Sequence, residues 1–183
     1  MPKPQRLLAT RPTLYLDFDG VLHPDEVYRR SDGTIFIKNV PGMVAQLFMW
    51  AADLEERIAK RDVQIVLATS WVQVLGFQRA LARLPKGIVD KVVGSTYHSS
   101  QRQEWEHCTR YQQIQTHATR HRIVSWLALE NDIQDWPSKA QHHLCPCDDT
   151  TGLSMQGSVL QAWLDEHAPL APMATTFSLP CGA

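Results

Sequence analysis

Short apolar segments alternate with segments of helical periodicity along the chain, and this alternation constrains the fold most. Five segments have the length of strands, at 14–18, 63–68, 89–96, 122–129 and 142–147. Between them, apolar residues recur at three- and four-residue steps, in 44–58, 74–84, 111–118 and 159–164. Apolar strands separated by helices are typical of a parallel sheet covered on both faces. The pattern predicts an α/β fold with a doubly wound, Rossmann-like parallel sheet flanked by helices.

Length and charge narrow the class of protein further. The chain has 183 residues, with 18 Lys and Arg against 19 Asp and Glu, a net charge of −1. We expect one domain over residues 1–168 and a flexible tail over 169–183, where three prolines interrupt any periodicity. The near-neutral charge does not indicate a nucleic-acid partner. No membrane-spanning or secretory segment is evident, and four scattered cysteines do not make a disulfide framework, so a cytoplasmic location is expected.

The first strand ends in two acidic residues, Asp17 and Asp19, followed by Gly20. Because side chains alternate along a strand, both carboxylates are expected on the same side. Two carboxylates in a partly dry crevice repel each other unless one is protonated or a cation joins them. A divalent ion such as Mg²⁺, held by these carboxylates and by phosphate oxygens of a substrate, is the usual solution.

Two later strands also end in polar residues. Thr69 and Ser70 follow the second strand, and their hydroxyls can bind a phosphate oxygen or cap the next helix. Glu130, Asp132 and Asp135 follow the fourth strand, where they can supply metal ligands or cap the next segment. Both interpretations stay open for each group. In doubly wound folds, ligands bind where the strands end, so these residues are expected near Asp17.

The motifs together resemble those of the haloacid dehalogenase (HAD) superfamily of phosphohydrolases. The string LYLDFDGVLHP (14–24) resembles its motif I, VQIVLATSW (63–71) its motif II, and SWLALENDIQDW (125–136) its motif IV. The string HLCPCDDTTGLS (143–154) is similar to the fifth strand and turn of small HAD domains, including those grouped with RNA-repair proteins. The likeness extends from Leu14 to His167.

The resemblance implies roles for the residues that match. Asp17 corresponds to the nucleophile that forms an aspartyl-phosphate, and Asp19 to the general acid/base. Thr69 corresponds to the phosphate-binding residue of motif II, with Ser70 as a second contact. Mg²⁺ would be bound by the Asp17 side chain and the backbone carbonyl of Asp19. The implied activity is a Mg²⁺-dependent phosphohydrolase that cleaves a phosphomonoester.

The chain departs from the family pattern at two places. Where motif III usually has Lys, the corresponding helix offers Arg110, which binds phosphate differently. Arg102, Lys91 and Arg120 are alternative sources of that cation. In motif IV, the usual pair of Asp residues is replaced by Glu130 and Asn131. Glu130, Asp132 and Asp135 are therefore all candidate metal ligands.

The resemblance also implies a capless enzyme. The segment between Asp19 and Thr69 has room for a short hairpin, 27–38, and one helix. An open site favours a large phosphorylated substrate, a partner or a homo-oligomer. A nucleic-acid end-processing phosphatase and a non-catalytic HAD-like binding module are the alternatives. Near the motifs, His23 is interpreted as a loop histidine, and Trp71 follows the phosphate-binding hydroxyls.

Overall fold

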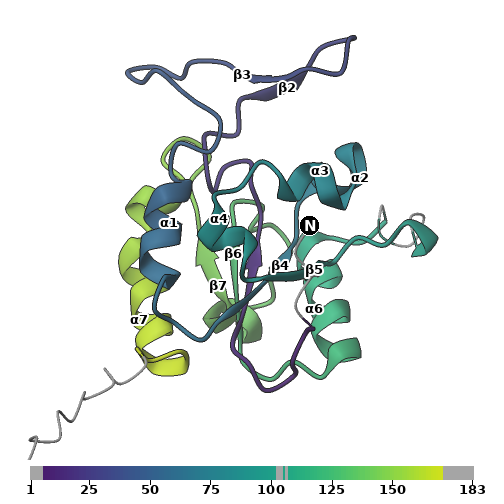
Figure 1. The fold of residues 1–183 in the computed structure, drawn as a ribbon, viewed down its shortest axis with the longest axis vertical. Coiled ribbons are helices and arrows are strands. Elements are labelled where there is room, and N and C mark those ends of the chain that lie inside the picture. The colour runs from purple at the N-terminus through teal and green to yellow at the C-terminus, as the bar shows by residue number, and fades with distance from the viewer. Residues whose placement is uncertain (1–5, 102–104, 106, 171–183) are drawn as a thin grey trace, which may run out of the picture.

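The protein, seen in a computed structural model, is built on a five-stranded parallel sheet (Figure 1). The structure describes residues 6–101, 105 and 107–170. The strands run in the order β5-β4-β1-β6-β7. They are β1 (Thr13–Leu16), β4 (Gln64–Leu67), β5 (Val92–Ser95), β6 (Trp126–Glu130) and β7 (Leu144–Pro146). The chain first builds the sheet outward from β1 to β5 and then returns to β1's other side. The strand order therefore reverses between β1 and β6, and the predicted doubly wound fold is confirmed.

Helices connect the strands and cover both faces of the sheet. They are α1 (Ala51–Ile58), α2 (Ser70–Leu75), α3 (Phe77–Leu81), α4 (Lys86–Val89), α6 (Arg110–His121) and α7 (Gly157–His167). Short 3-10 turns are formed by η1 (Ser99–Gln101), η2 (Ser138–His143) and η3 (Leu153–Met155). Figure 1 shows α1 and α7 on one side of the sheet and α6 on the other.

Two apolar clusters follow from the alternation of side chains along the strands. In β1, Leu14 and Leu16 join the cluster that includes residues of α1 and α7, whereas Tyr15 joins the cluster beneath α6. Both clusters contain fully buried residues. Burial on both faces is the physical reason for the near-continuous apolar runs in the sequence.

The helical periodicity of 44–58 gives a helix that is too long. The chain has turns up to Trp50, Val44 is 72% exposed, and α1 begins only at Ala51. Phe48 has a φ of 61°, in the left-handed region, which no continuous α-helix contains. The predicted helix over 74–84 is likewise divided into α2 and α3 at Gly76, whose φ is 85°.

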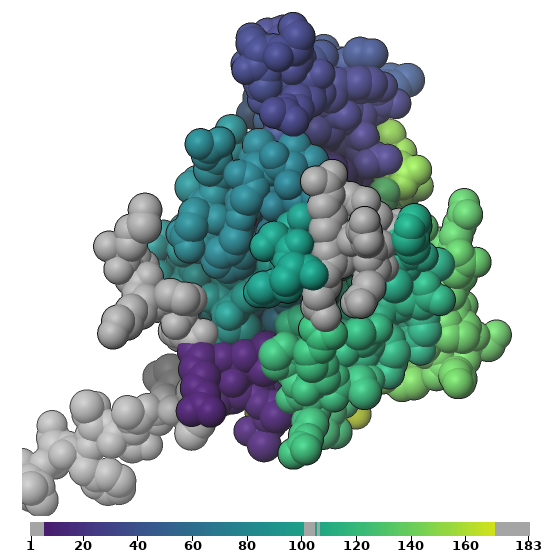
Figure 2. Space-filling model, turned by 90° about the vertical axis from the view of Figure 1, so that its right-hand side faces the viewer, coloured from purple at the N-terminus to yellow at the C-terminus, as the bar shows by residue number. Residues whose placement is uncertain are grey.

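The predicted hairpin is present as β2 (Val27–Arg29) and β3 (Ile35–Ile37), which pair antiparallel. Figures 1 and 2 show it projecting from one end of the molecule, beyond the edge where the strands of the main sheet end. Most of the expected tail, 171–183, lies outside the described residues. None of the described helices is long and apolar enough to cross a bilayer.

Candidate active site

The candidate site lies at the carboxyl edge of the sheet, where the strand order reverses. Asp17 comes directly after β1, and its N–H donates to the carbonyl oxygen of Leu129 in β6 at 3.2 Å. Its carboxylate accepts a hydrogen bond from the N–H of Phe18 at 2.7 Å, and the residue is only 4% exposed. Glu130, the last residue of β6, is fully buried. The fold thus brings both acidic residues to the edge of the sheet at which doubly wound folds bind ligands.

A single guanidinium group contacts both of these carboxylates. Arg110 Nη2 donates to Asp17 Oδ2 at 2.9 Å, and Arg110 Nε lies 2.9 Å from Glu130 Oε2. The second contact is an ion pair rather than a hydrogen bond, because neither atom has a hydrogen-bond partner of suitable angle. Arg110 is the first residue of α6, which begins with a capping box between Thr109 and Gln112. The cap fixes where the helix starts and therefore where the guanidinium lies.

The buried charges of this cluster shift the pKa values of Glu130 and Arg110. Burial, together with the neighbouring Asp17 carboxylate, raises the pKa of Glu130 well above its usual value, although Arg110 opposes this shift. Burial lowers the pKa of Arg110, but the charges of Asp17 and Glu130 outweigh it and the net shift is upward. Arg110 therefore stays charged, and the cluster has two acidic groups facing one cation.

The residues present fit a divalent cation of the Mg²⁺ type. Asp17 and Glu130 supply hard oxygen ligands in a buried site, and Glu130 Oε2 lacks a hydrogen-bond partner. Mg²⁺ is usually bound by one or two carboxylates, with water and substrate oxygens completing its shell. Among the described residues, no group of three or more His, Cys, Asp or Glu side chains could hold a metal ion. Asp17 and Glu130 are the residues that would hold such an ion.

Asp19 is held by two donors from other parts of the chain. His23 Nε2 lies 3.0 Å and Trp71 Nε1 lies 2.8 Å from the same oxygen, Asp19 Oδ1. His23 lies in the loop after β1, as expected, but it is fully buried there. Next to Asp19, Gly20 has a φ of 64°, and the side chain of Asn131 occupies the space of a Cβ. Only glycine fits this turn.

The hydroxyl residues after β4 begin α2. Thr69 is the N-cap, because its side chain accepts a hydrogen bond from the N–H of Trp71 at 3.3 Å, and it is 1% exposed. Ser70 is half-buried in the first turn. The capping interpretation of Thr69 thus describes its local structure. Phosphate binding by Thr69 and Ser70 stays a prediction.

Those of the remaining predicted site residues that the structure describes lie in exposed positions or on other elements of the fold. Asp132 has an exposed side chain, and it contributes its backbone N–H to Glu130 Oε1 at 3.1 Å. Asp135 is exposed, with a φ of 63°. Of the alternative cations, Lys91 precedes β5 and donates to the Arg61 carbonyl oxygen, Arg120 is near the other end of α6, and Arg102 lies outside the described residues.

One acidic residue near the site was not predicted from the sequence. Asp25 follows motif I, and its N–H donates to the carbonyl oxygen of Asp149 at 2.8 Å. Burial, with the charges of Asp19, Asp149 and Asp17, raises the pKa of Asp25 to about 6. In the sequence, Asp25 is one acidic residue in a polar segment. Its contact with Asp149, in the loop after β7, is evident only in the folded structure.

A parallel sheet of this order, with a buried aspartate after β1 and an acid at the end of β6, defines an HAD-like α/β domain. Residues 13–157 match the family described as the HAD domain in Swiss Army Knife RNA repair proteins, and the chain belongs to that family. The resemblance inferred from the motifs is therefore confirmed. No curated protein and no solved structure matches the chain significantly.

Proposed function

We propose that this protein is a Mg²⁺-dependent phosphohydrolase that cleaves a phosphomonoester through an aspartyl-phosphate on Asp17. The observation that carries the proposal is the contact of one guanidinium, Arg110, with both Asp17 and Glu130 at the carboxyl edge of the sheet. Family membership supports the same class of activity. Phosphoryl transfer depends mainly on positioning and on neutralisation of charge, which this cluster supplies.

In the first step, an oxygen of Asp17 attacks the phosphorus and forms a new P–O bond. The bond between phosphorus and the leaving-group oxygen breaks, and that oxygen takes a proton from the Asp19 carboxyl group. Asp19 is suited to this role because its side chain is 23% exposed, whereas that of Asp17 is almost fully enclosed. Arg110, in contact with Asp17, offsets the negative charges of the nucleophile and of the phosphoryl group that approaches it.

In the second step, the Asp19 carboxylate takes a proton from water. The water oxygen then bonds to phosphorus, the bond to Asp17 breaks, and inorganic phosphate leaves with Asp17 restored as a carboxylate. Both steps use the same proton site in opposite directions. When bound, Mg²⁺ would lie on Asp17 and Glu130 and reduce the repulsion between the anionic substrate and the anionic nucleophile.

The test is phosphate release from a panel of phosphomonoesters, with Mg²⁺ and with a chelator. We expect turnover that requires Mg²⁺ and that falls at least ~10³-fold in Asp17→Asn, because the amide is a poor nucleophile. Asp90→Asn is the control, since Asp90 is a surface acid paired with Lys86. Turnover that survives in Asp17→Asn would exclude the covalent mechanism, and no turnover on any substrate would favour a non-catalytic binding module.

A second candidate function is removal of phosphate from a nucleic-acid end, favoured by the hairpin. Tyr28 is 40% exposed, its ring lies 5.9 Å from that of Phe36, and Lys38 and Arg30 lie over the two rings. Aromatic rings beside cations are the usual platform for unpaired bases. The hairpin projects beyond the edge where Asp17 lies (Figure 1), and the family description mentions RNA repair.

This second function is tested by comparing a phosphorylated oligonucleotide with a small phosphomonoester. Loss of one stacked base costs about 1–3 kcal/mol, so Tyr28→Ala should lower kcat/KM for the oligonucleotide by about 5- to 150-fold. The small substrate serves as the control and should change little. Equal effects on both substrates, or none, would exclude the hairpin as a base-binding platform.

A further inference from the structure

We propose that His23 and Trp71 are positioning residues that fix which oxygen of Asp19 exchanges the proton during phosphoryl transfer. The inference rests on the proposed function, because it concerns the general acid/base of that reaction. Both residues act through Asp19, and the contacts that they make with it involve N–H groups and a single carboxylate oxygen.

The two donors meet at one oxygen. Trp71 Nε1 can only donate, and it lies 2.8 Å from Asp19 Oδ1. His23 Nε2 lies 3.0 Å from the same atom. Two hydrogen bonds occupy both lone pairs of Oδ1, so a proton on the carboxyl group is left to Oδ2. Among the described residues, nothing donates a hydrogen bond to Oδ2, and the side chain is 23% exposed.

The backbone determines the tautomer of His23. The N–H of Phe48 donates to His23 Nδ1 at 3.2 Å, so Nδ1 carries a lone pair and the proton of the neutral ring is on Nε2. His23 Nε2 is therefore the donor toward Asp19. The other tautomer would place two lone pairs against each other at Asp19 Oδ1 and two protons against each other at Nδ1.

An aromatic cluster holds this arrangement in place. It consists of Phe18, His23, Phe48 and Trp71, and five edge-to-face pairs among them have ring centroids 5.0 to 5.9 Å apart. Phe48 reaches it with a φ of 61°, a conformation that aromatic residues rarely adopt. Strained backbone persists where the surroundings fix it, and here its N–H is the group that binds His23.

As a consequence, the two carboxyl oxygens of Asp19 have different roles. Oδ1 is the fixed acceptor, and Oδ2 is the oxygen that gives a proton to the leaving group and later takes one from water. Without the two donors, the carboxyl group would rotate among several orientations. Only a fraction of molecules would then present the proton to the leaving-group oxygen.

The test uses substrates that differ in their need for a general acid. An alkyl phosphate has a poor leaving group and needs the proton, whereas p-nitrophenyl phosphate does not. In Trp71→Phe and His23→Phe, which keep a ring but remove one N–H, we expect kcat/KM for the alkyl phosphate to fall about 10- to 100-fold. The value for p-nitrophenyl phosphate should stay within about threefold. Because water activation also uses Asp19, p-nitrophenol should then appear as an initial burst.

Controls separate this role from a structural one. Trp163→Phe makes the same change in a buried tryptophan of α7 and should leave both substrates unaffected. His23→Gln, which restores an N–H near the position of Nε2, should recover part of the alkyl-phosphate activity. If His23→Phe does not fold, as its melting curve would reveal, Trp71→Phe carries the test.

Each outcome decides the matter. Equal losses on both substrates, or no loss on the alkyl phosphate, would overturn the positioning role while the phosphohydrolase activity stands. A wild-type protein inactive on both substrates, or turnover that Asp17→Asn does not reduce, would overturn the proposed function itself and the positioning role with it.

Discussion

The most informative single residues are those whose charge the fold controls. His117, on α6, forms a hydrogen bond of 2.9 Å between its Nδ1 and the Tyr15 hydroxyl. Tyr15 keeps its proton, because burial raises its pKa. Burial, with His121 and Arg120 nearby, lowers the pKa of His117 to about 3. His117 is thus neutral in the folded protein over the whole physiological range.

This shift predicts sensitivity to acid. The unfolded chain takes up a proton at His117 below about pH 6.5, while the folded protein does not until about pH 3. Stability present above pH 6.5 is therefore lost as the pH falls through that window, by about 2 kcal/mol between pH 6.5 and 4.5. Urea unfolding of His117→Gln, which keeps a hydrogen-bonding side chain beside Tyr15, should lose this part of the pH dependence. If the free energy of unfolding depends on pH in the same way for wild type and variant, the role of His117 in acid sensitivity is contradicted.

Arg110 leads to a second prediction at the same scale. Its removal leaves two enclosed carboxylates, Asp17 and Glu130, without their cation. Breaking a buried ion pair costs about 3–5 kcal/mol, so Arg110→Met should lower the free energy of unfolding by that amount in a chelator. Added Mg²⁺ should restore part of the loss. Lys86→Met, at an exposed pair, should change stability by less than about 1 kcal/mol. A stable, Mg²⁺-insensitive Arg110→Met would contradict this account of the cluster.

Some site residues could be predicted from the sequence and others could not. Asp17 and Glu130 end apolar strands, and parallel strands bring their carboxyl ends to one edge, so their proximity follows from local pattern and fold class. The contact of His23 with Asp19 depends on the N–H of Phe48, whose left-handed backbone no periodicity indicates. Local chemistry predicted the acids, but tertiary contact decided how Asp19 is oriented.

At the scale of the elements, the strands were predictable and the helix ends were not. A strand buried on both faces leaves a continuous apolar run, so β1 and β4 are evident in the sequence. Apolar spacing over 44–58 resembles a helix because turn residues there also pack against the core, Leu47 and Phe48 among them. The spacing of apolar residues indicates which side chains are buried, but it does not indicate whether the backbone there is a helix or a series of turns.

The break between α2 and α3 gives a prediction for these elements. Gly76 has φ 85° and ψ 151°, a region that is essentially restricted to glycine, and a Cβ there would meet nothing within 4 Å. Gly76→Ala should therefore lower the free energy of unfolding by about 1–3 kcal/mol through backbone strain alone. Gly94→Ala, where a Cβ also meets nothing and φ is ordinary, is the matched control for thermal or urea unfolding. Equal stability of the two variants would contradict the strain.

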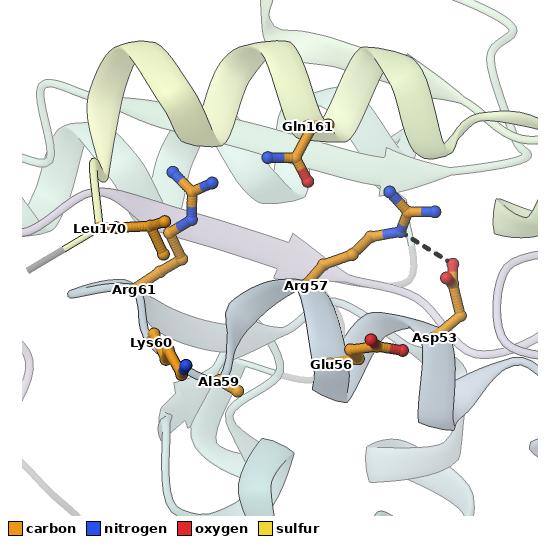
Figure 3. Close-up of a pocket in the computed structure, with 8 residues that line it drawn as sticks. All are labelled: Asp53, Glu56, Arg57, Ala59, Lys60, Arg61, Gln161 and Leu170. Carbon is orange, nitrogen blue, oxygen red and sulfur yellow. Dashed lines mark hydrogen bonds and ion pairs between the residues drawn. The ribbon is translucent and has the colours of Figure 1, made fainter.

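At the scale of the whole molecule, one arginine joins the first half of the chain to the last helix. Arg61, just after α1, donates through Nη1 to the carbonyl oxygens of Leu164 and Ala168, both at 3.1 Å, and through Nη2 to Asp165 at 2.6 Å. Figure 3 shows Arg61 and Arg57 in the cavity between α1 and α7. Arg61 is thus a second donor to the Leu164 carbonyl oxygen, which also accepts from the N–H of Ala168, and it supplies a donor to the carbonyl oxygen of Ala168 just past the end of α7.

Loss of the contacts between Arg61 and the end of α7 should lower the free energy of unfolding. Arg61→Met would remove the hydrogen bonds to the Leu164 and Ala168 carbonyl oxygens and to Asp165, and we expect a loss of about 3 kcal/mol in the free energy of urea unfolding. Gln161→Met changes a residue of the same cavity whose bond to Asp165 is exposed, and should change stability by about 0.5 kcal/mol or less. If the two variants unfold alike, α7 is held by apolar packing and not by Arg61.

In the function proposed above, the sheet order, the two buried acids and Arg110 all serve a single chemical event, the transfer of a phosphoryl group to Asp17. The most direct measurement is the mass of the protein and of its peptides after brief incubation with Mg²⁺ and p-nitrophenyl phosphate, followed by an acid quench. We expect one added phosphoryl group, on the peptide that contains Asp17, in wild type and in greater amount in Trp71→Phe. Turnover with no phosphorylated Asp17, or a phosphoryl group that persists at the same peptide in Asp17→Asn, would contradict covalent catalysis by this residue.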